Sequence, residues 1–142
     1  MTRIVMGYFI LFLVLAEPFA TQADERFPTT GHQKATVQLL EYRFEPAQIT
    51  LKAGEEVELT LVNEGMVMHE FITEALHDLT VDVEINGVVA ETLGVAELEI
   101  PPKAKVVLRF TPKKFGEFPI SCRAREPKDH FKEGMVARIL IR

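Results

Sequence analysis

Hydrophobic and polar residues alternate along several short segments of this chain. The clearest case is residues 57–61, which read Val-Glu-Leu-Thr-Leu. A period of two places one face of a strand in a core and the other face toward solvent. Further segments with strand character are residues 35–42, 48–52, 105–110, 118–122 and 136–141.

Glycine and proline residues mark the ends of these segments. Gly54 follows the second segment, and Pro101-Pro102 precedes the segment at 105–110. No long segment shows a helical period, and no internal repeat is present. Short strands at close spacing, separated by turn residues, predict an all-β sandwich with Greek-key connections.

The N-terminal residues have the pattern of a secretory signal. Arg3 precedes an apolar run at residues 4–16, and the small residues Ala20 and Ala23 follow it. The apolar run is too short to span a membrane comfortably. We therefore expect a signal peptide at residues 1–23, a flexible lead-in at 24–34, one domain at 35–142 and a periplasmic location. Cleavage after Ala20 and an uncleaved N-terminal anchor are the alternatives.

The net charge limits the classes of partner. The chain carries 16 Lys and Arg against 21 Asp and Glu, a formal net charge of −5. Binding to nucleic acid requires clustered positive charge on the protein. The mild acidity therefore argues against nucleic acid and is consistent with an exported protein.

The only cysteine lies in the segment with the most distinctive chemistry. Cys122 is followed by His130 and Met135, between apolar segments at 118–122 and 136–141. An exported chain with one cysteine cannot form an internal disulfide, and a bound metal would hold the sulfur as a thiolate. The alternative is a buried cysteine that packs as a small hydrophobic residue.

A copper ion suits these groups. Two imidazoles, one thiolate and a weak axial thioether are the ligands of blue-copper sites. The second imidazole must come from elsewhere, and the leading candidate is His69, within the apolar run at residues 66–72. His77 is a less favoured replacement for either histidine, and we expect His32 to be exposed to solvent.

Several segments together resemble a known family. Residues 42–46, 48–55, 57–63 and 68–71 are similar to the first half of small bacterial cupredoxins, the plastocyanin- and azurin-like type 1 copper proteins. With the cysteine, histidine and methionine that follow, the resemblance extends over nearly all of the chain beyond the signal. It implies a cupredoxin-like sandwich and one copper ion. The implied ligands are His69, Cys122, His130 and, in the axial position, Met135.

The resemblance also implies a one-electron carrier, not an enzyme, that acts between redox partners such as cytochromes or membrane oxidases. In such folds an exposed imidazole edge usually exchanges the electron, and we expect His130, beside Phe131, to provide it. We expect a monomer, with peripheral contact to a membrane left open. A periplasmic chaperone or storage protein that binds Cu(I) through Cys, His and Met, with Met66 and Met68 involved, is the alternative. A metal-free cupredoxin domain is a third interpretation.

The chain departs from the family pattern in three places. Seven residues, 123–129, separate Cys122 from His130, a longer spacing than is familiar. Glu70 stands where several relatives have an asparagine that braces the ligand loop, so it is expected either to accept a similar hydrogen bond or to face water. Residues 75–99 contain Asn86-Gly87 between alternating segments, which predicts a hairpin insertion. We expect this hairpin to form a flap near the copper end.

Overall fold

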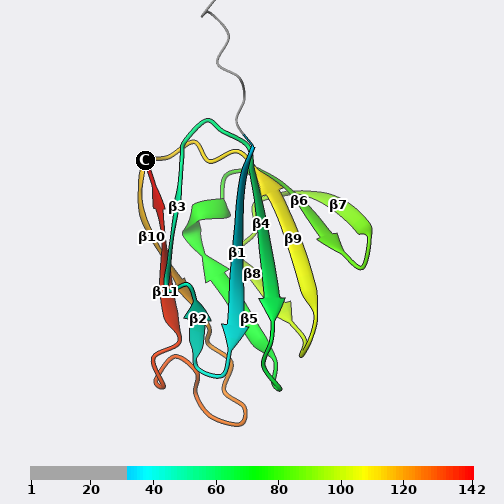
Figure 1. The fold of residues 1–142 in the computed structure, drawn as a ribbon, viewed down its shortest axis with the longest axis vertical. Coiled ribbons are helices and arrows are strands. Elements are labelled where there is room, and N and C mark those ends of the chain that lie inside the picture. The colour runs from blue at the N-terminus through cyan, green and yellow to red at the C-terminus, as the bar shows by residue number, and fades with distance from the viewer. Residues whose placement is uncertain (1–31) are drawn as a thin grey trace, which may run out of the picture.

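The computed structural model describes residues 32–142, and these form two β-sheets packed face to face (Figure 1). The strands are β1 (Gln33–Leu40), β2 (Arg43–Glu45), β3 (Gln48–Leu51), β4 (Val57–Asn63), β5 (His69–Thr73), β6 (Thr80–Ile85), β7 (Val88–Leu93), β8 (Glu97–Ile100), β9 (Lys105–Phe110), β10 (Gly116–Ser121) and β11 (Val136–Ile141), with one 3₁₀ turn, η1 (Glu74–Leu76). The predicted all-β sandwich is confirmed. The predicted signal at 1–23 and most of the lead-in lie outside the described residues, and among the described residues no helix is long and apolar enough to cross a membrane.

The first sheet has six strands in the order β2-β1-β4-β9-β6-β7, and the second has five in the order β3-β11-β10-β5-β8. Both are mixed sheets, because β1 runs parallel to β4 and β3 runs parallel to β11, while the other neighbours are antiparallel. Strands from distant parts of the sequence therefore lie side by side. In particular, β5 and β11 both flank β10, the strand that leads to Cys122.

The alternation in the sequence corresponds to the two faces of each sheet. Along β4, every second residue from Val57 to Asn63 is buried and the residues between them are half-buried. The inner faces of both sheets form one hydrophobic core, which includes Phe44, Phe71, Leu108 and Ile120. Cys122 and Met135 belong to the same core, so the predicted site lies at the edge of the packed interior.

The hairpin at residues 75–99 is present but is not a flap over the predicted site. β6 and β7 pair across Asn86-Gly87, as predicted, with Ile85 opposite Val88. However, β6 also pairs with β9, and β7 forms the outer edge of the six-stranded sheet (Figure 1). The expected flap near the copper end was therefore wrong, because strand pairing with β9 holds the hairpin in the sheet.

The first strand also differs slightly from its predicted bounds. β1 begins at Gln33, two residues before the expected start of the domain, because Gln33 pairs with Val57 at the start of β4. Its side-chain amide additionally exchanges hydrogen bonds with the backbone of Lys52. The strand ends at Leu40, and residues 41 and 42 form a tight turn into β2, where Leu40 pairs with Arg43.

Candidate metal centre

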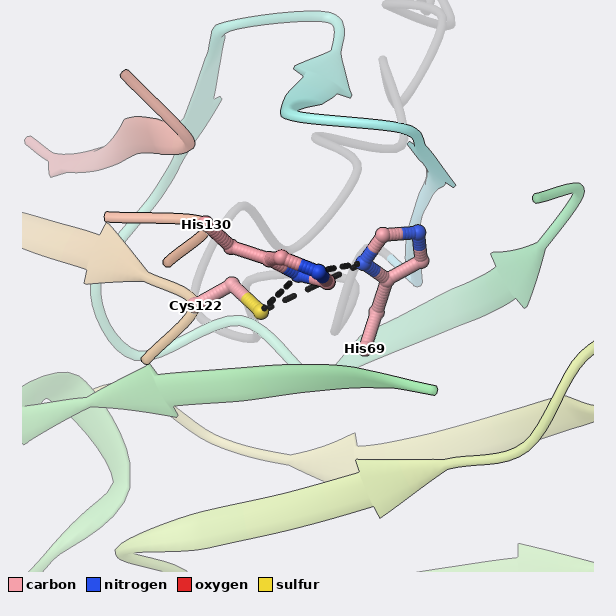
Figure 2. A group of neighbouring side chains, drawn as sticks. All are labelled: His69, Cys122 and His130. Carbon is pink, nitrogen blue, oxygen red and sulfur yellow. Dashed lines mark hydrogen bonds between the residues drawn. The ribbon is translucent and has the colours of Figure 1, made fainter. Parts of the chain in front are cut away.

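Three of the predicted ligands converge at one end of the sandwich. His69 is the first residue of β5, Cys122 follows the last residue of β10, and His130 lies in the loop that leads to β11. The Nδ1 atoms of the two histidines are 3.2 Å apart, and Cys122 Sγ lies 3.2 Å from His130 Nδ1 and 4.0 Å from His69 Nδ1. Figure 2 shows the sulfur and both ring nitrogens directed at one another. The structure brings these three residues together, and their coordination of a metal stays a prediction.

All three side chains are fully buried. Burial, followed by repulsion from His130, lowers the pKa of His69, because desolvation disfavours the charged imidazolium. Burial likewise raises the pKa of the Cys122 thiol. A cation that binds here must therefore displace the thiol proton, and its positive charge stabilises the thiolate that remains.

The backbone around Cys122 supports its sulfur. The N–H of Glu70 donates a hydrogen bond to Cys122 Sγ at 3.2 Å. The carboxylate of Glu70 accepts a hydrogen bond from the N–H of Arg123 at 2.9 Å. Of the two predictions for Glu70, the bracing role is correct. One residue thus links the strand of His69 to the loop that follows the cysteine.

The long loop between Cys122 and His130 folds back over the second histidine. The N–H of His130 donates to Ala124 O at 2.9 Å, and His130 Nε2 lies 3.1 Å from Glu126 O. A carbonyl oxygen can only accept, so His130 Nε2 is the donor of this bond, and Nδ1 is the ring nitrogen that faces Cys122. The exposed imidazole edge expected for His130 was wrong: its exposed fraction is 0%.

Met135 lies beside the other residues through its backbone. The N–H of Cys122 donates to Met135 O at 3.2 Å, and the N–H of Met135 donates to His130 O at 3.0 Å. The side chain of Met135 is fully buried in the core. The position is consistent with an axial ligand, and coordination by its sulfur stays a prediction.

The loop before His69 depends on the last residue of β4, Asn63, which was not predicted as part of the site. Asn63 is fully buried, and its side-chain Nδ2 donates to Val67 O at 2.8 Å and to Ile100 O at 2.7 Å. Its Oδ1 accepts the N–H of Gly65 at 2.9 Å. A buried asparagine that satisfies three backbone groups fixes the path of residues 63–67. Its signal in the sequence was a polar residue at a core-facing position of β4.

The turn between β1 and β2 also reaches the site, a contact that no pattern in the sequence predicted. The carboxylate of Glu41 accepts the backbone N–H of Met66, in the loop that leads to His69. The ring of Tyr42 packs edge-on against the ring of His130, with centroids 5.2 Å apart and planes at 82°. One two-residue turn therefore contacts both histidine-bearing loops.

The remaining candidate residues lie outside this group. His32 is exposed, as predicted, and its Nδ1 lies 3.1 Å from a carboxylate oxygen of Glu56. His77 is exposed at the end of η1 and takes no part in the cluster. Met66 and Met68 are 74% and 39% exposed, so neither fills a gap in the core.

Comparison with known proteins identifies the family. The family model described as "Cupredoxin-like domain" matches residues 4–132. The chain belongs to the cupredoxin family. The match includes His69, Cys122 and His130, and Met135 lies beyond its end.

Individual relatives of this cupredoxin are distant. It is 28% identical over 104 residues to the copper-resistant cuproprotein CopI of Rubrivivax gelatinosus, a match that covers 70% of this chain and 60% of CopI. Its fold is similar to auracyanin from the photosynthetic bacterium Roseiflexus castenholzii, with a TM-score of 0.53 and 12% identity over 78% of this chain and 97% of that one. It is also similar to part of a multicopper oxidase from Campylobacter jejuni, with a TM-score of 0.57 and 12% identity over 84% of this chain and 32% of the oxidase.

The donor atoms of this cupredoxin fit one copper ion. Two imidazole nitrogens and one thiol sulfur lie within 4.8 Å of one another. Imidazole and thiolate are ligands that copper accepts in trigonal blue-copper sites. The hydrogen bond from His130 Nε2 to Glu126 O orients one ring for binding through Nδ1, as outer hydrogen bonds do for metal-bound histidines.

Proposed function

We propose that this cupredoxin is an exported one-electron carrier with a type 1 copper site formed by His69, Cys122, His130 and Met135. The observation that carries the proposal is the convergence of two buried imidazole Nδ1 atoms on one buried cysteine sulfur. A copper ion bound by these residues would supply the exchange of a single electron between Cu(I) and Cu(II).

The protein residues contribute a rigid site. His69 is held by β5, which pairs with β8 and β10, while Cys122 follows β10 and is bonded to the backbone of Met135. Strand pairing on both sides of β5 and hydrogen bonds to the loops limit movement of the ligands. A rigid ligand set favours electron exchange because little rearrangement accompanies a change of charge.

The test is the visible absorption spectrum after addition of Cu(II) to the full chain and to Cys122→Ser. We expect an intense thiolate-to-copper band in the wild-type chain that is absent from Cys122→Ser. The matched control is His77→Gln, which removes an exposed histidine and should keep the band. A wild-type chain without the band, or a band that survives in Cys122→Ser, would contradict the proposal.

Carriage of Cu(I) without electron transfer is the second candidate function. The similarity to CopI, a copper-resistant cuproprotein, supports it, as do the exposed thioethers of Met66 and Met68 next to His69. Soft thioether and thiolate ligands select Cu(I). Tight Cu(I) binding without a Cu(II)-thiolate band would favour this function, and a Met66→Leu/Met68→Leu chain should then bind Cu(I) more weakly.

Further parts of the proposal concern location, partners and catalysis. Export is supported by the pattern of residues 1–23 and is tested by the mass of the periplasmic protein, which should lack them.

We propose redox proteins such as cytochromes or membrane oxidases as partners of a monomer. We also propose that the chain is not an enzyme, since its four histidines are too few for the additional copper centres of a multicopper oxidase. Turnover of an oxidase substrate by the copper-loaded chain would contradict this.

A further inference from the structure

The buried ligands raise the question of how an electron reaches them, if the chain carries electrons as proposed. His69, Cys122, His130 and Met135 all have an exposed fraction of 0%. Electronic coupling falls steeply with distance, so exchange with a partner requires a short path from a ligand to the surface. The path must include a residue that is not itself a ligand.

Backbone groups touch the ligands from outside. The N–H of Glu70 donates to Cys122 Sγ, Gly65 lies close to His69 Nε2, and the carbonyl of Glu126 accepts a hydrogen bond from His130 Nε2. Within residues 32–142, Tyr42 is the only aromatic residue outside the cluster whose ring packs against the ring of a ligand. Its ring meets His130 edge-on at 5.2 Å between centroids, and Tyr42 is partly exposed.

The position of Tyr42 in the backbone is unusual. Its φ angle is 65°, in the left-handed region. A bulky residue rarely adopts this region, because its Cβ crowds the following carbonyl oxygen. Asn86, which lies in the other two-residue hairpin turn, has φ 52° and is a residue type that tolerates the region. Strained backbone of this kind is found at functional sites, and here it places an aromatic ring against a ligand.

Phe131 offers a direct comparison. It follows His130 in the sequence and is 51% exposed. Within the described part of the chain, its ring does not stack against the ring of His130. Proximity in the sequence therefore favours Phe131, whereas contact in space favours Tyr42. Lys128 adds a positive charge above the ring of Tyr42, with Nζ 5.5 Å from the centroid.

We propose that Tyr42 is the relay residue between the buried ligand His130 and an external one-electron partner, in place of an exposed histidine edge. In the oxidising direction the protein loses one electron and the acceptor gains it. No bond is formed or broken, no proton moves, and Tyr42 is not itself oxidised. The inference rests on the proposed electron-carrier function and names the surface at which that function operates.

The test compares variants of the full, copper-loaded chain. The protein is reduced with ascorbate, the excess ascorbate is removed, and the rate constant for oxidation by hexacyanoferrate(III) is measured by stopped flow. The reduction potential of each variant is also measured, so that the rate constants are compared at equal driving force. Tyr42→Phe keeps the ring and should keep the wild-type rate constant. Tyr42→Leu keeps a bulky cover without the ring and should lower the rate constant about tenfold, or about 1.4 kcal/mol in activation free energy.

Two controls separate the relay from general effects. Phe131→Leu removes an exposed ring that does not stack against the ring of His130, and Asn86→Gly alters the left-handed residue of the distant hairpin turn. Both should keep the wild-type rate constant. Tyr42→Gly removes the ring and suits the left-handed backbone, so it should fold even if Tyr42→Leu does not, and should also be slow. A rate constant for Tyr42→Gly or Tyr42→Leu that is unchanged or higher would overturn the relay.

A measurement without copper tests the contact itself. In the metal-free chain the NMR shifts of the His130 ring protons should change in Tyr42→Leu and be retained in Tyr42→Phe, because the aromatic ring current acts on them. Equal shifts in all three proteins would overturn the contact. Absence of the Cu(II)-thiolate band from the wild-type chain would instead overturn the electron-carrier function. A wild-type band with a rate constant insensitive to Tyr42 would overturn the relay alone.

Discussion

The carboxylate of Glu70 accepts a hydrogen bond from the backbone N–H of Arg123 at 2.9 Å. This bond joins the residue after His69 to the residue after Cys122. The N–H of Glu70 also donates to Cys122 Sγ, so Glu70 contacts both Cys122 and the residue that follows it. The protein's own hydrogen bonds therefore join the two ligand-bearing segments.

The first prediction concerns this tie. Glu70→Ala should lower the free energy of unfolding of the metal-free chain by about 1 kcal/mol, the usual worth of one hydrogen bond. Glu70→Gln should lower it less, because the amide oxygen can still accept. Thermal or urea unfolding measures both.

The control for Glu70 is a neighbouring carboxylate. Glu99 lies opposite Glu70 in the pairing of β5 with β8, belongs to the same group of acidic side chains and is exposed. Glu99→Ala removes an equal charge but keeps the hydrogen bond between Glu70 and Arg123, and should not destabilise the chain. A loss of stability in Glu99→Ala equal to that in Glu70→Ala would mean that charge, and not the hydrogen bond, is responsible.

The second prediction concerns Asn63. Asn63→Leu removes both donors to the carbonyls of Val67 and Ile100, and the Gly65 N–H keeps only its second acceptor, Leu39 O. We therefore expect a loss of about 3 kcal/mol in the free energy of unfolding. Asn63→Asp keeps the acceptor for the N–H of Gly65 but loses both donors. In urea unfolding of the metal-free chains, the aspartate variant should therefore have a lower free energy of unfolding than the wild-type chain. A leucine variant as stable as the wild-type chain would refute the bracing role.

The sequence predicted those parts of the fold that depend on local pattern. The alternation at 57–61 corresponds to β4, and the apolar segment at 136–141 corresponds to β11. The grouping of His69, Cys122 and His130 was also predicted, because these residues match the blue-copper ligands that the resemblance to cupredoxins implies.

The parts that could not be predicted depend on contacts between distant segments. Glu41 and Tyr42 reach the site only because β1 ends beside it in the folded sheet, and no periodicity in the sequence records such a contact. The burial of His130 depends on the shape of residues 123–129, which is set by hydrogen bonds to Ala124 and Glu126. The position of the 75–99 hairpin depends on pairing with β9, which lies later in the sequence.

The third prediction concerns the close approach of Gly65 to His69. A Cβ added at Gly65 would lie 2.8 Å from His69 Nε2 and 2.6 Å from the Glu41 carboxylate, both shorter than a van der Waals contact. Gly65→Ala should therefore displace the His69 ring. Changes of groups that orient a metal-bound histidine cost about 10- to 100-fold in metal affinity, and we expect a loss in that range.

The measurement for Gly65→Ala is competitive titration of Cu(I) with a chromophoric chelator. The double variant Gly65→Ala/Glu41→Ala removes the contact with the carboxylate but leaves the contact with the imidazole. It should stay as weak as Gly65→Ala alone. Recovery of full affinity in the double variant would show that Glu41, and not His69, was the group that moved.

The last prediction is the pH dependence contributed by Glu41. The N–H of Met66 is the main cause that holds the pKa of Glu41 below its ordinary value of 4.5, since a hydrogen bond to the carboxylate favours its charged form. The unfolded chain then binds this proton more readily than the folded chain. The stabilisation is therefore present above about pH 4.5 and is lost as the pH falls through the folded-state pKa. Glu41→Gln should lower the melting temperature of the metal-free chain above pH 4.5, with a difference from the wild-type chain that shrinks toward lower pH. Glu91→Gln, which neutralises an exposed carboxylate on β7, should not show this difference, and a Glu41→Gln difference that is constant with pH would exclude the charged hydrogen bond as its source.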